Sequence, residues 1–265
     1  MPMPRNANEV SGEKGSMTAV LLVGGLGSRL KSVLPSTPKP LAPVGEGSFL
    51  ELLVMQLRVQ GIQSIVMCTG HLAGLIEAEF GDGSRFGVKI RYSREASPMG
   101  TAGALKLAEQ YISEGCEFLV MNGDSFVEMD IPQFIRLHRR SHGLASMALC
   151  EVPDAARYGT VVVDRQSRVT AFKEKTGSHA PGLINAGAYV FNRDILQRIP
   201  EGPGSLEKDV FPRLLELGFY AFEQYGMFID IGTPEDYARA QALSANLRRA
   251  VAEGNVGSTI AGDAR

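Results

Sequence analysis

A segment rich in glycine, proline and basic residues, VGGLGSRLKSVLPSTPKPLAPV, runs from Val23 to Val44 between two apolar runs. Its first part combines flexible backbone with a hydroxyl and a guanidinium group, in Gly24, Gly25, Gly27, Ser28 and Arg29. Backbone N–H groups of such a loop can converge on phosphate oxygens, and an arginine can bind one in a bidentate fork. The segment predicts a loop that wraps a polyphosphate, although a tight turn with a surface arginine explains the glycines alone equally well.

Two common phosphate-binding motifs are excluded in this segment. A Walker A motif needs Gly-Lys-Ser or Gly-Lys-Thr, and a dinucleotide fingerprint needs a third glycine where Leu30 stands. Lys39 instead lies between Pro38 and Pro40, which restrict the backbone on both of its sides. Such restriction is useful for aiming an ammonium group at a phosphate that is being transferred.

Two aspartates occur in apolar surroundings. Asp124 follows the run EFLVM at Asn122-Gly123, and Asp230 lies in MFIDIG. A carboxylate is costly there unless it is paired or bound to a metal, and Mg²⁺ typically takes one or two carboxylates plus substrate phosphates. We predict that Asp124 and Asp230 are Mg²⁺ ligands. A turn or helix cap is the alternative for Asp124, and a buried ion pair is the alternative for Asp230.

Glu95 is a candidate for recognising a nucleotide base. Its carboxylate could accept the N1–H and N2–H groups of guanine together, which uracil cannot match, and Gly100 and Gly103 would let the loop lie against the ring. A surface loop acid is the alternative. His138 and His142 have the i, i+4 spacing of a zinc-binding pair, but their basic and polar neighbours favour a solvated helix end.

The first half of the chain alternates apolar strands with helices, which predicts a mostly parallel sheet with helices on both faces. The expected strands are Thr18–Val23, Ser64–Cys68, Val88–Tyr92 and Glu117–Met121, and the expected helices are Phe49–Gln60, Leu72–Phe80 and Ala102–Tyr111.

From Leu144 the pattern changes to strands with few helices between them, which predicts a smaller mixed or antiparallel portion. These strands are Ser146–Val152, Gly159–Asp164, Val169–Lys173 and Leu183–Phe191. Thr233-Pro234-Glu235-Asp236 predicts the start of the last helix, with Thr233 as N-cap. Pro212 predicts a kink or two short helices between Ser205 and Leu217.

Composition bounds the class of protein. With 265 residues, 44% of them hydrophobic, the chain can bury a large core, and a net charge of −2 gives no global attraction to nucleic acid or membranes. The three cysteines, in or near apolar runs, predict reduced thiols in a cytoplasmic protein, and no spanning helix or signal peptide is seen. We expect a disordered extension over 1–16, one domain over 17–250 with halves 17–143 and 144–250, and a flexible tail over 251–265.

Taken together, these motifs resemble the signature of the sugar-1-phosphate nucleotidyltransferases, the nucleotide-sugar pyrophosphorylases. The similarity covers about residues 17–245 and rests on GGLGSRL with PKP, and on the blocks EASPMGTAGAL, NGD, YG, FKEK, NAG and IDIGTP. It departs from the family at Val23, where alanine is usual. The resemblance implies a GT-A-like nucleotidyltransferase fold: a Rossmann-like, mostly parallel mixed sheet flanked by helices, with a small mixed or antiparallel sugar-binding portion.

The resemblance also implies an activity and a set of site residues. The activity is Mg²⁺-dependent transfer of a nucleoside monophosphate from an NTP to a sugar 1-phosphate, with release of pyrophosphate. The residues implied in catalysis are Arg29, Lys39, Asp124 and Lys175. Those implied in nucleotide binding are the glycine loop with Ser28, and Glu95, Gly100, Thr101 and Gly103. Those implied in sugar-phosphate binding are Tyr158, Gly159, Glu174, Lys175 and Asn185.

Within the family, the resemblance is closest to guanylyltransferases that act on D-glycero-D-manno-heptose 1-phosphate, and next to those that act on mannose 1-phosphate. GTP and the heptose phosphate are therefore the expected substrates, and other NTP and hexose pairs stay open. Glycosyltransferases share the layout but normally carry an Asp-x-Asp motif, which is absent here. A non-catalytic nucleotide-sugar sensor would tend to lose the cationic loop or an acidic ligand, and Arg29, Lys39, Asp124 and Asp230 are all present. A homodimer is retained as a possible assembly.

Overall fold

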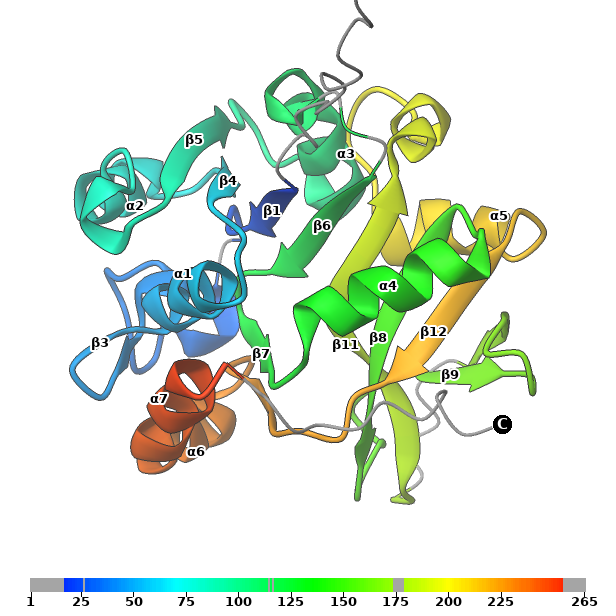
Figure 1. Cartoon of the computed structure of the whole chain (residues 1–265). Coiled ribbons are helices and arrows are strands. Elements are labelled where there is room, and N and C mark those ends of the chain that lie inside the picture. The colour runs from blue at the N-terminus through cyan, green and yellow to red at the C-terminus, as the bar shows by residue number, and fades with distance from the viewer. Residues whose placement is uncertain (1–16, 26, 114, 116, 174–178, 255–265) are drawn as a thin grey trace, which may run out of the picture.

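The computed structural model describes residues 17–254 except 26, 114, 116 and 174–178, so the predicted extension over 1–16 and most of the predicted tail lie outside the described residues. Within this part of the chain, one nine-stranded sheet has the path β10-β9-β11-β6-β1-β4-β5, with β8 paired to β11 and β12 paired to β8 (Figure 1). Its strands are β1 (Thr18–Leu22), β4 (Ser64–Thr69), β5 (Lys89–Arg94), β6 (Glu117–Asn122), β8 (Ala145–Val152), β9 (Thr160–Val163), β10 (Val169–Lys173), β11 (Gly182–Asn192) and β12 (Phe219–Glu223).

The sheet is parallel in its first half and mixed in its second, as the sequence pattern predicts. Strands β6, β1, β4 and β5 pair in parallel, whereas β11 is antiparallel to both β6 and β8. The two halves therefore share one continuous sheet at the β6–β11 boundary. The register between β11 and β8 shifts between Asn185 and Tyr189, so β11 bends at this point.

Helices cover both faces of the sheet because neighbouring side chains of its buried strands point to opposite sides. In β1, Ala19 and Leu21 belong to one core and Val20 belongs to the other. The first core lies under α1 (Phe49–Val59), α2 (Ala73–Phe80), α4 (Ile131–Ser141), α6 (Pro234–Ala242) and α7 (Ser244–Ala252), and the second lies under α3 (Gly100–Leu107) and α5 (Phe211–Leu214). Figure 1 shows α4 crossing in front of β8 and β11, with α5 on the far side.

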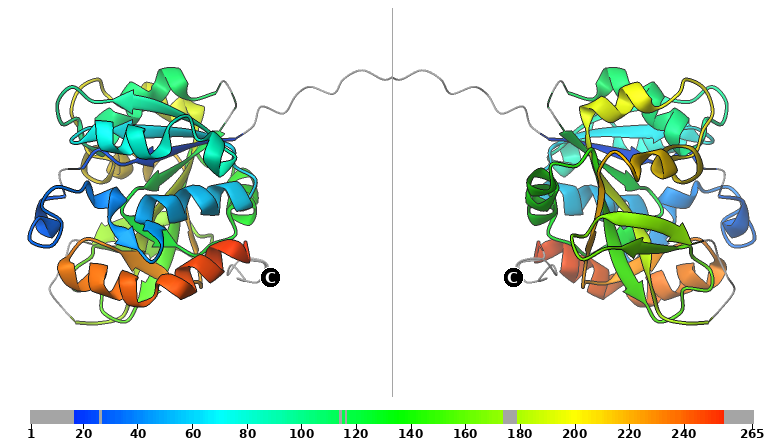
Figure 2. Two further views of the ribbon diagram at one scale, coloured as in Figure 1. Left: turned by 90° about the vertical axis from the view of Figure 1, so that its left-hand side faces the viewer. Right: turned by 90° about the vertical axis from the view of Figure 1, so that its right-hand side faces the viewer.

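The predicted helix boundaries near prolines are confirmed. Thr233 caps α6, and its hydroxyl accepts the N–H of Asp236 at 3.3 Å. Around Pro212 the chain forms two short helical pieces, a π-helical turn at Leu206–Val210 followed by α5. After α6, helix α7 packs along α1 and continues to Ala252, as the two side views of Figure 2 show in red and blue.

Four short strands lie outside the main sheet and were not predicted. They form two small antiparallel pairs, β2 (Pro43–Val44) with β3 (Gly47–Ser48), and β7 (Ser125–Val127) with β13 (Phe228–Asp230). Strand β12 was also missed. Segments of two to five residues are too short to show a periodic pattern.

Two further expectations concern buried groups and membranes. Cys68 and Cys150 are buried free thiols, as predicted, while Cys116 lies outside the described residues. Among the residues that the structure describes, no helix combines the length and the apolar composition that crossing a membrane requires.

The prediction of a solvated helix end at His138 and His142 is wrong for His138. This side chain is 2% exposed on the inner face of α4, and its Nδ1 lies 2.9 Å from the Ser146 hydroxyl of β8. His142 follows the helix as its C-cap with a φ of +52°, so the two rings do not share a helical face. The basic neighbours of His138 lie on the outer face of α4, whereas His138 itself lies on the inner face.

Burial of His138 makes the fold sensitive to acid. Burial is the main cause that lowers the pKa of His138, so the unfolded chain takes up a proton at a higher pH than the folded chain does. The free energy of unfolding should fall as the pH drops below about 6.5, by at most about 1.4 kcal/mol per pH unit from this group. Urea titrations from pH 7.5 to 5 should show a steeper loss for the wild type than for His138→Gln. An exposed-histidine control, His71→Gln, should keep the wild-type slope; equal slopes for the wild type and His138→Gln would contradict the assignment.

Candidate active site

The small β7–β13 ladder brings Asp124 and Asp230 together. Asp124 lies in the turn between β6 and β7, and Asp230 ends β13, where it pairs with Ser125. The ladder continues through a hydrogen bond of 3.0 Å from the backbone N–H of Ile231 to the carbonyl of Asp124. Two carboxylates that are distant in sequence therefore face the same corner of the sheet.

Lys39 occupies this corner between the two carboxylates. Its Nζ lies 2.6 Å from Asp124 Oδ2 and 3.8 Å from Asp230 Oδ1, and its side chain is 12% exposed. Pro38 precedes it with a φ of −56° and a ψ of 137°, and a 3₁₀ turn over Lys39–Leu41 follows. The two prolines thus fix the backbone from which the ammonium group reaches the acids.

The charge environment of Asp230 follows from this arrangement. Burial and the neighbouring charge of Asp124 raise the pKa of Asp230 to about 6, and Lys39 acts in the opposite direction. Arg29 acts on Asp230 in the same direction as Lys39, from an exposed position on the 3₁₀ turn Ser28–Leu30. One ammonium group therefore compensates the two acids only in part.

This corner has the chemistry of a divalent cation site. Within the described part of the chain, His, Cys, Asp and Glu side chains nowhere gather in threes that could hold a metal ion, so the acidic ligands here are two carboxylates. Two hard oxygen donors that leave the remaining positions to water and phosphate suit Mg²⁺. Asp124 and Asp230 fit such an ion, which would take the place of the Lys39 ammonium between them.

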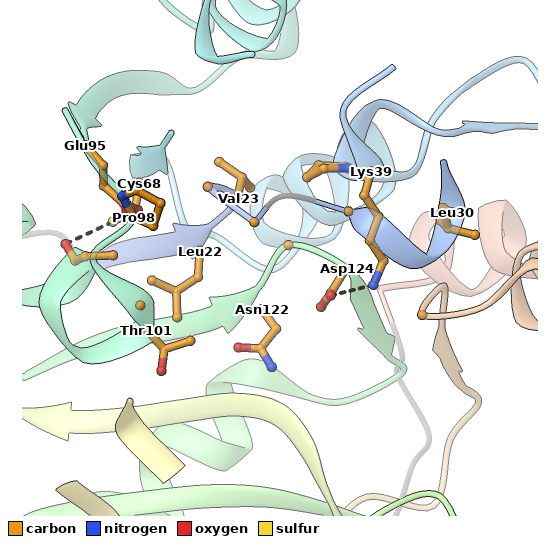
Figure 3. Close-up of a pocket in the computed structure, with 18 of the residues that line it drawn as sticks. Leu22, Val23, Leu30, Lys39, Cys68, Glu95, Pro98, Thr101, Asn122 and Asp124 are labelled. Carbon is orange, nitrogen blue, oxygen red and sulfur yellow. Dashed lines mark hydrogen bonds and ion pairs between the residues drawn. The ribbon is translucent and has the colours of Figure 1, made fainter. Parts of the chain in front are cut away.

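A cavity of about 400 Å³ extends from this corner along the end of β1 (Figure 3). Gly24, Gly25, Gly27 and Arg29 of the glycine loop line it, as do Lys39 and Asp124. A Cβ on Gly24 would lie 2.6 Å from Glu95 Oε1 and would displace that carboxylate. Gly27 has a φ of +57°, and a Cβ there would lie 3.2 Å from Lys39 Cβ, so the glycine lets the loop pack closely on Lys39. The backbone of Ser28 lies in the turn that follows.

Glu95 lies at the other end of the cavity. Figure 3 places it beside Cys68 and Pro98, away from Lys39 and Asp124. Its Oε2 accepts the backbone N–H of Met99 at 2.7 Å, which fixes the carboxylate, and burial raises its pKa. The Cys68 thiol donates to the carbonyl of Ala104 at 3.5 Å, and burial raises its pKa so far that it is inert as a nucleophile.

Two of the three predicted nucleotide-binding residues of α3 line the cavity, and the third packs against a neighbouring loop. Gly100 and Thr101 line the cavity, and the Thr101 hydroxyl accepts the N–H of Leu206 at 2.8 Å. Gly103 does not line it. A Cβ there would lie 2.4 Å from the carbonyl of Gly202, so Gly103 makes room for a neighbouring loop.

The structure describes three of the five predicted sugar-phosphate-binding residues. Tyr158 and Gly159 lie in the loop before β9, where the Tyr158 ring packs edge-on against Phe228 of β13. Asn185 uses both polar atoms within β11, because its amide donates to the Tyr189 hydroxyl at 2.7 Å and its oxygen accepts the N–H of Gly187 at 2.9 Å. The structure thus gives Asn185 a role in shaping the bend of β11. Glu174 and Lys175 lie outside the described residues.

Asn122 and Gly123 are among the cavity residues that were not predicted as site residues. Both line the cavity between the two ends. A Cβ on Gly123 would lie 2.4 Å from Cγ1 of Val23 and 2.8 Å from the carbonyl of Leu22, so the glycine lets two strand ends approach each other. Their position in the same Asn-Gly-Asp block as Asp124 is the signal that could have identified them.

Comparisons with known proteins match most of the chain. The family model described as nucleotidyl transferase matches residues 18–246. A mannose-1-phosphate guanylyltransferase of Mycobacterium tuberculosis is 38% identical over 88% of this chain, which spans 65% of that relative. A D-glycero-alpha-D-manno-heptose 1-phosphate guanylyltransferase of Aneurinibacillus thermoaerophilus is 39% identical over 85% of this chain and 97% of its own length.

Solved structures of related sequence share the fold of this chain. The crystal structure of HddC from Yersinia pseudotuberculosis complexed with GMP-PN has a TM-score of 0.77 and 35% identity, and the match covers 85% of this chain and 98% of HddC. The predicted fold class, a mostly parallel mixed sheet flanked by helices in a GT-A-like arrangement, is confirmed.

A metal ion held by the two carboxylates would compete with Lys39 for them, so removal of Lys39 should strengthen metal binding. In Lys39→Met the acids lose their cationic partner, so Mn²⁺ used as a probe without nucleotide should bind about tenfold more tightly. Isothermal titration calorimetry or Mn²⁺ electron paramagnetic resonance measures this affinity. Lys31→Met, which removes an exposed lysine of the same segment, is the matched control and should keep the wild-type affinity. Weaker Mn²⁺ binding by Lys39→Met would contradict the competition.

Proposed function

Because this chain belongs to the nucleotidyl transferase family, we propose that it transfers GMP from GTP to D-glycero-D-manno-heptose 1-phosphate, giving GDP-heptose and pyrophosphate. The relatives named as heptose 1-phosphate guanylyltransferases are matched over 97% of their length. We place this biosynthetic activity in the cytoplasm, where the buried thiols of Cys68 and Cys150 would stay reduced.

The observation that supports the proposal is the order of the chemical groups from one end of the cavity to the other. Lys39 and Asp124 line a reacting end, where Asp230 stands behind Lys39, and Glu95 forms a base-recognising end, with the glycine loop between them. A nucleoside triphosphate has the same order: base, sugar, and phosphates. The cavity of about 400 Å³ is within the range of small-molecule sites.

The reaction needs no protein nucleophile. An oxygen of the sugar 1-phosphate attacks the α-phosphorus of GTP and forms the new P–O bond. The bond from this phosphorus to the oxygen that bridges to the β-phosphate breaks in line, and pyrophosphate leaves with that electron pair. Catalysis is then positioning and charge neutralisation. Lys39 neutralises charge on the transferring group, Arg29 stabilises the leaving pyrophosphate, and Lys175 orients the attacking phosphate.

Mg²⁺ bound to Asp124 and Asp230 would polarise the phosphate oxygens and hold the two substrates against each other. The carboxylates orient the ion, and β7–β13 keeps them at a fixed separation. An ion held by Asp124 and Asp230 would take over the charge compensation that Lys39 now supplies, and the Lys39 ammonium group could then contact phosphate.

A second candidate is mannose 1-phosphate with GTP. The observation that favours it is the 38% identity to a mannose-1-phosphate guanylyltransferase. A screen separates the candidates: pyrophosphate release is measured with Mg²⁺ for ATP, CTP, GTP and UTP, each with heptose, mannose and glucose 1-phosphate. We expect GTP with the heptose phosphate to give the highest kcat/KM, and Lys39→Met to lower kcat about 100- to 1000-fold. Activity with mannose 1-phosphate alone would overturn the heptose assignment, and no release from any pair would favour a sensor.

Glu95 should determine the preference for guanine. In Glu95→Gln the side chain loses one acceptor and gains a donor that faces guanine N–H groups, so kcat/KM for GTP should fall roughly 10- to 100-fold. ITP lacks the 2-amino group, so the wild type should prefer GTP to ITP and the variant should lose this preference. Initial rates with both nucleotides measure the ratio. Glu216→Gln removes an exposed carboxylate and serves as control; an unchanged GTP-to-ITP ratio in Glu95→Gln would exclude the role.

A further inference from the structure

An ion pair outside the reacting corner joins two segments that are far apart in sequence. Arg157 lies in the loop between β8 and β9, and its guanidinium donates to Asp236 Oδ2 in the first turn of α6 at 2.5 Å. The two residues are 79 positions apart. The Arg157 side chain is 50% exposed and that of Asp236 is 17% exposed, so the acid is held in a partly buried position.

Asp236 is already fixed by the start of α6. Its Oδ2 accepts the Thr233 hydroxyl at 2.8 Å, while its own N–H donates to Thr233 Oγ1 at 3.3 Å. Thr233 thus caps α6 and at the same time holds the carboxylate of Asp236. Because Thr233 follows Asp230 by three residues, an arginine bound to Asp236 is attached to the segment that carries the second acid of the reacting corner.

The loop that carries Arg157 contacts the same segment a second time. The ring of Tyr158 packs edge-on against Phe228 of β13 with centroids 6.2 Å apart, and the Arg157 guanidinium lies 5.7 Å from the centroid of Tyr158. A cavity of about 490 Å³ lies beside these contacts, and Arg157, Tyr158, Asp230, Asp236 and Arg239 are among the residues that line it. Asp230 thus borders both this cavity and, through Lys39, the nucleotide cavity.

We propose that Arg157 is a positioning residue for the acceptor half of the site: it fixes the loop of Tyr158 and Gly159 at a set distance from Asp230 by binding Asp236. The inference rests on the proposed function, because the acceptor is a sugar 1-phosphate. On the far side of the loop, the N–H of Ala155 donates to the carbonyl of Ala180 at 2.9 Å and holds the loop to the segment before β11. Toward β13 and α6, the charged hydrogen bond of Arg157 adds a directional contact to the Tyr158–Phe228 ring packing.

A second ion pair of the chain serves as a control, because it shows what the loss of an ordinary surface ion pair does. Arg85 binds Glu79 at 2.6 Å and lies 4.5 Å from the ring centroid of Phe86, so it makes the same two kinds of contact as Arg157. It joins α2 to the turn that follows, away from both cavities. Exposed pairs of this kind contribute little to stability. Arg85→Met is therefore the matched control for Arg157→Met.

The test is a steady-state comparison of the two substrates. In Arg157→Met the KM for the sugar 1-phosphate should rise about tenfold, because the loop loses its fixed position, while the KM for GTP stays within about twofold. Arg157→Lys should restore part of the loss, Asp236→Asn should reproduce it, and the double variant should be no worse than either single one. Arg85→Met should leave both KM values unchanged. An equal rise in both KM values, or no rise in either, would overturn the proposal.

Hydrogen exchange gives a readout that is independent of turnover. Peptides covering residues 155–159 and 228–237 should exchange faster in Arg157→Met than in the wild type, and at the wild-type rate in Arg85→Met. If the wild type transfers GMP to no sugar 1-phosphate, the proposed function fails and the exchange data alone decide whether the ion pair fixes the loop. Unchanged exchange in both peptides would refute this role of Arg157 whatever the activity.

Discussion

The site depends on repulsion between two carboxylates that the fold forces together. Asp124 and Asp230 lie at the same end of the β7–β13 ladder, one before β7 begins and the other where β13 ends, and the ammonium group of Lys39 contacts both. Burial and then the neighbouring charge of Asp124 raise the pKa of Asp230 to about 6. The rigid Pro-Lys-Pro segment, the glycine loop that packs on it and the short ladder all serve to hold like charges in a place where they bind a cation.

The parts of the fold that follow from local pattern could be predicted from the sequence. The buried strands, the α1 helix, the Thr233 cap and the break at Pro212 depend on residue types within a few positions, and the structure reproduces them. The sequence also singled out Lys39, Asp124 and Asp230, because a lysine between prolines and acids in apolar runs are unusual at the level of single residues. The structure brings these three side chains together.

What could not be predicted depends on contacts between distant segments. The β7–β13 ladder has three residues in each strand and no periodic pattern. His138 was misjudged because its basic neighbours lie on the outer face of α4, and only the docking of that helix on β8 decides which face is buried. The hydrogen bonds of Asn185 within β11 and the close approach of Gly103 to the carbonyl of Gly202 are further contacts that their motifs do not reveal. The partnership of Arg157 with Asp236 likewise has no local signal.

The short ladder has a consequence for how the protein is made. Strands β1, β4, β5 and β6 and the glycine loop are complete when synthesis has passed Asp124, but β13 and Asp230 emerge much later. The glycine loop and Asp124 therefore leave the ribosome long before the second acid. The reacting corner cannot be completed until β13 has been synthesised, and a chain that ends before β13 lacks Asp230.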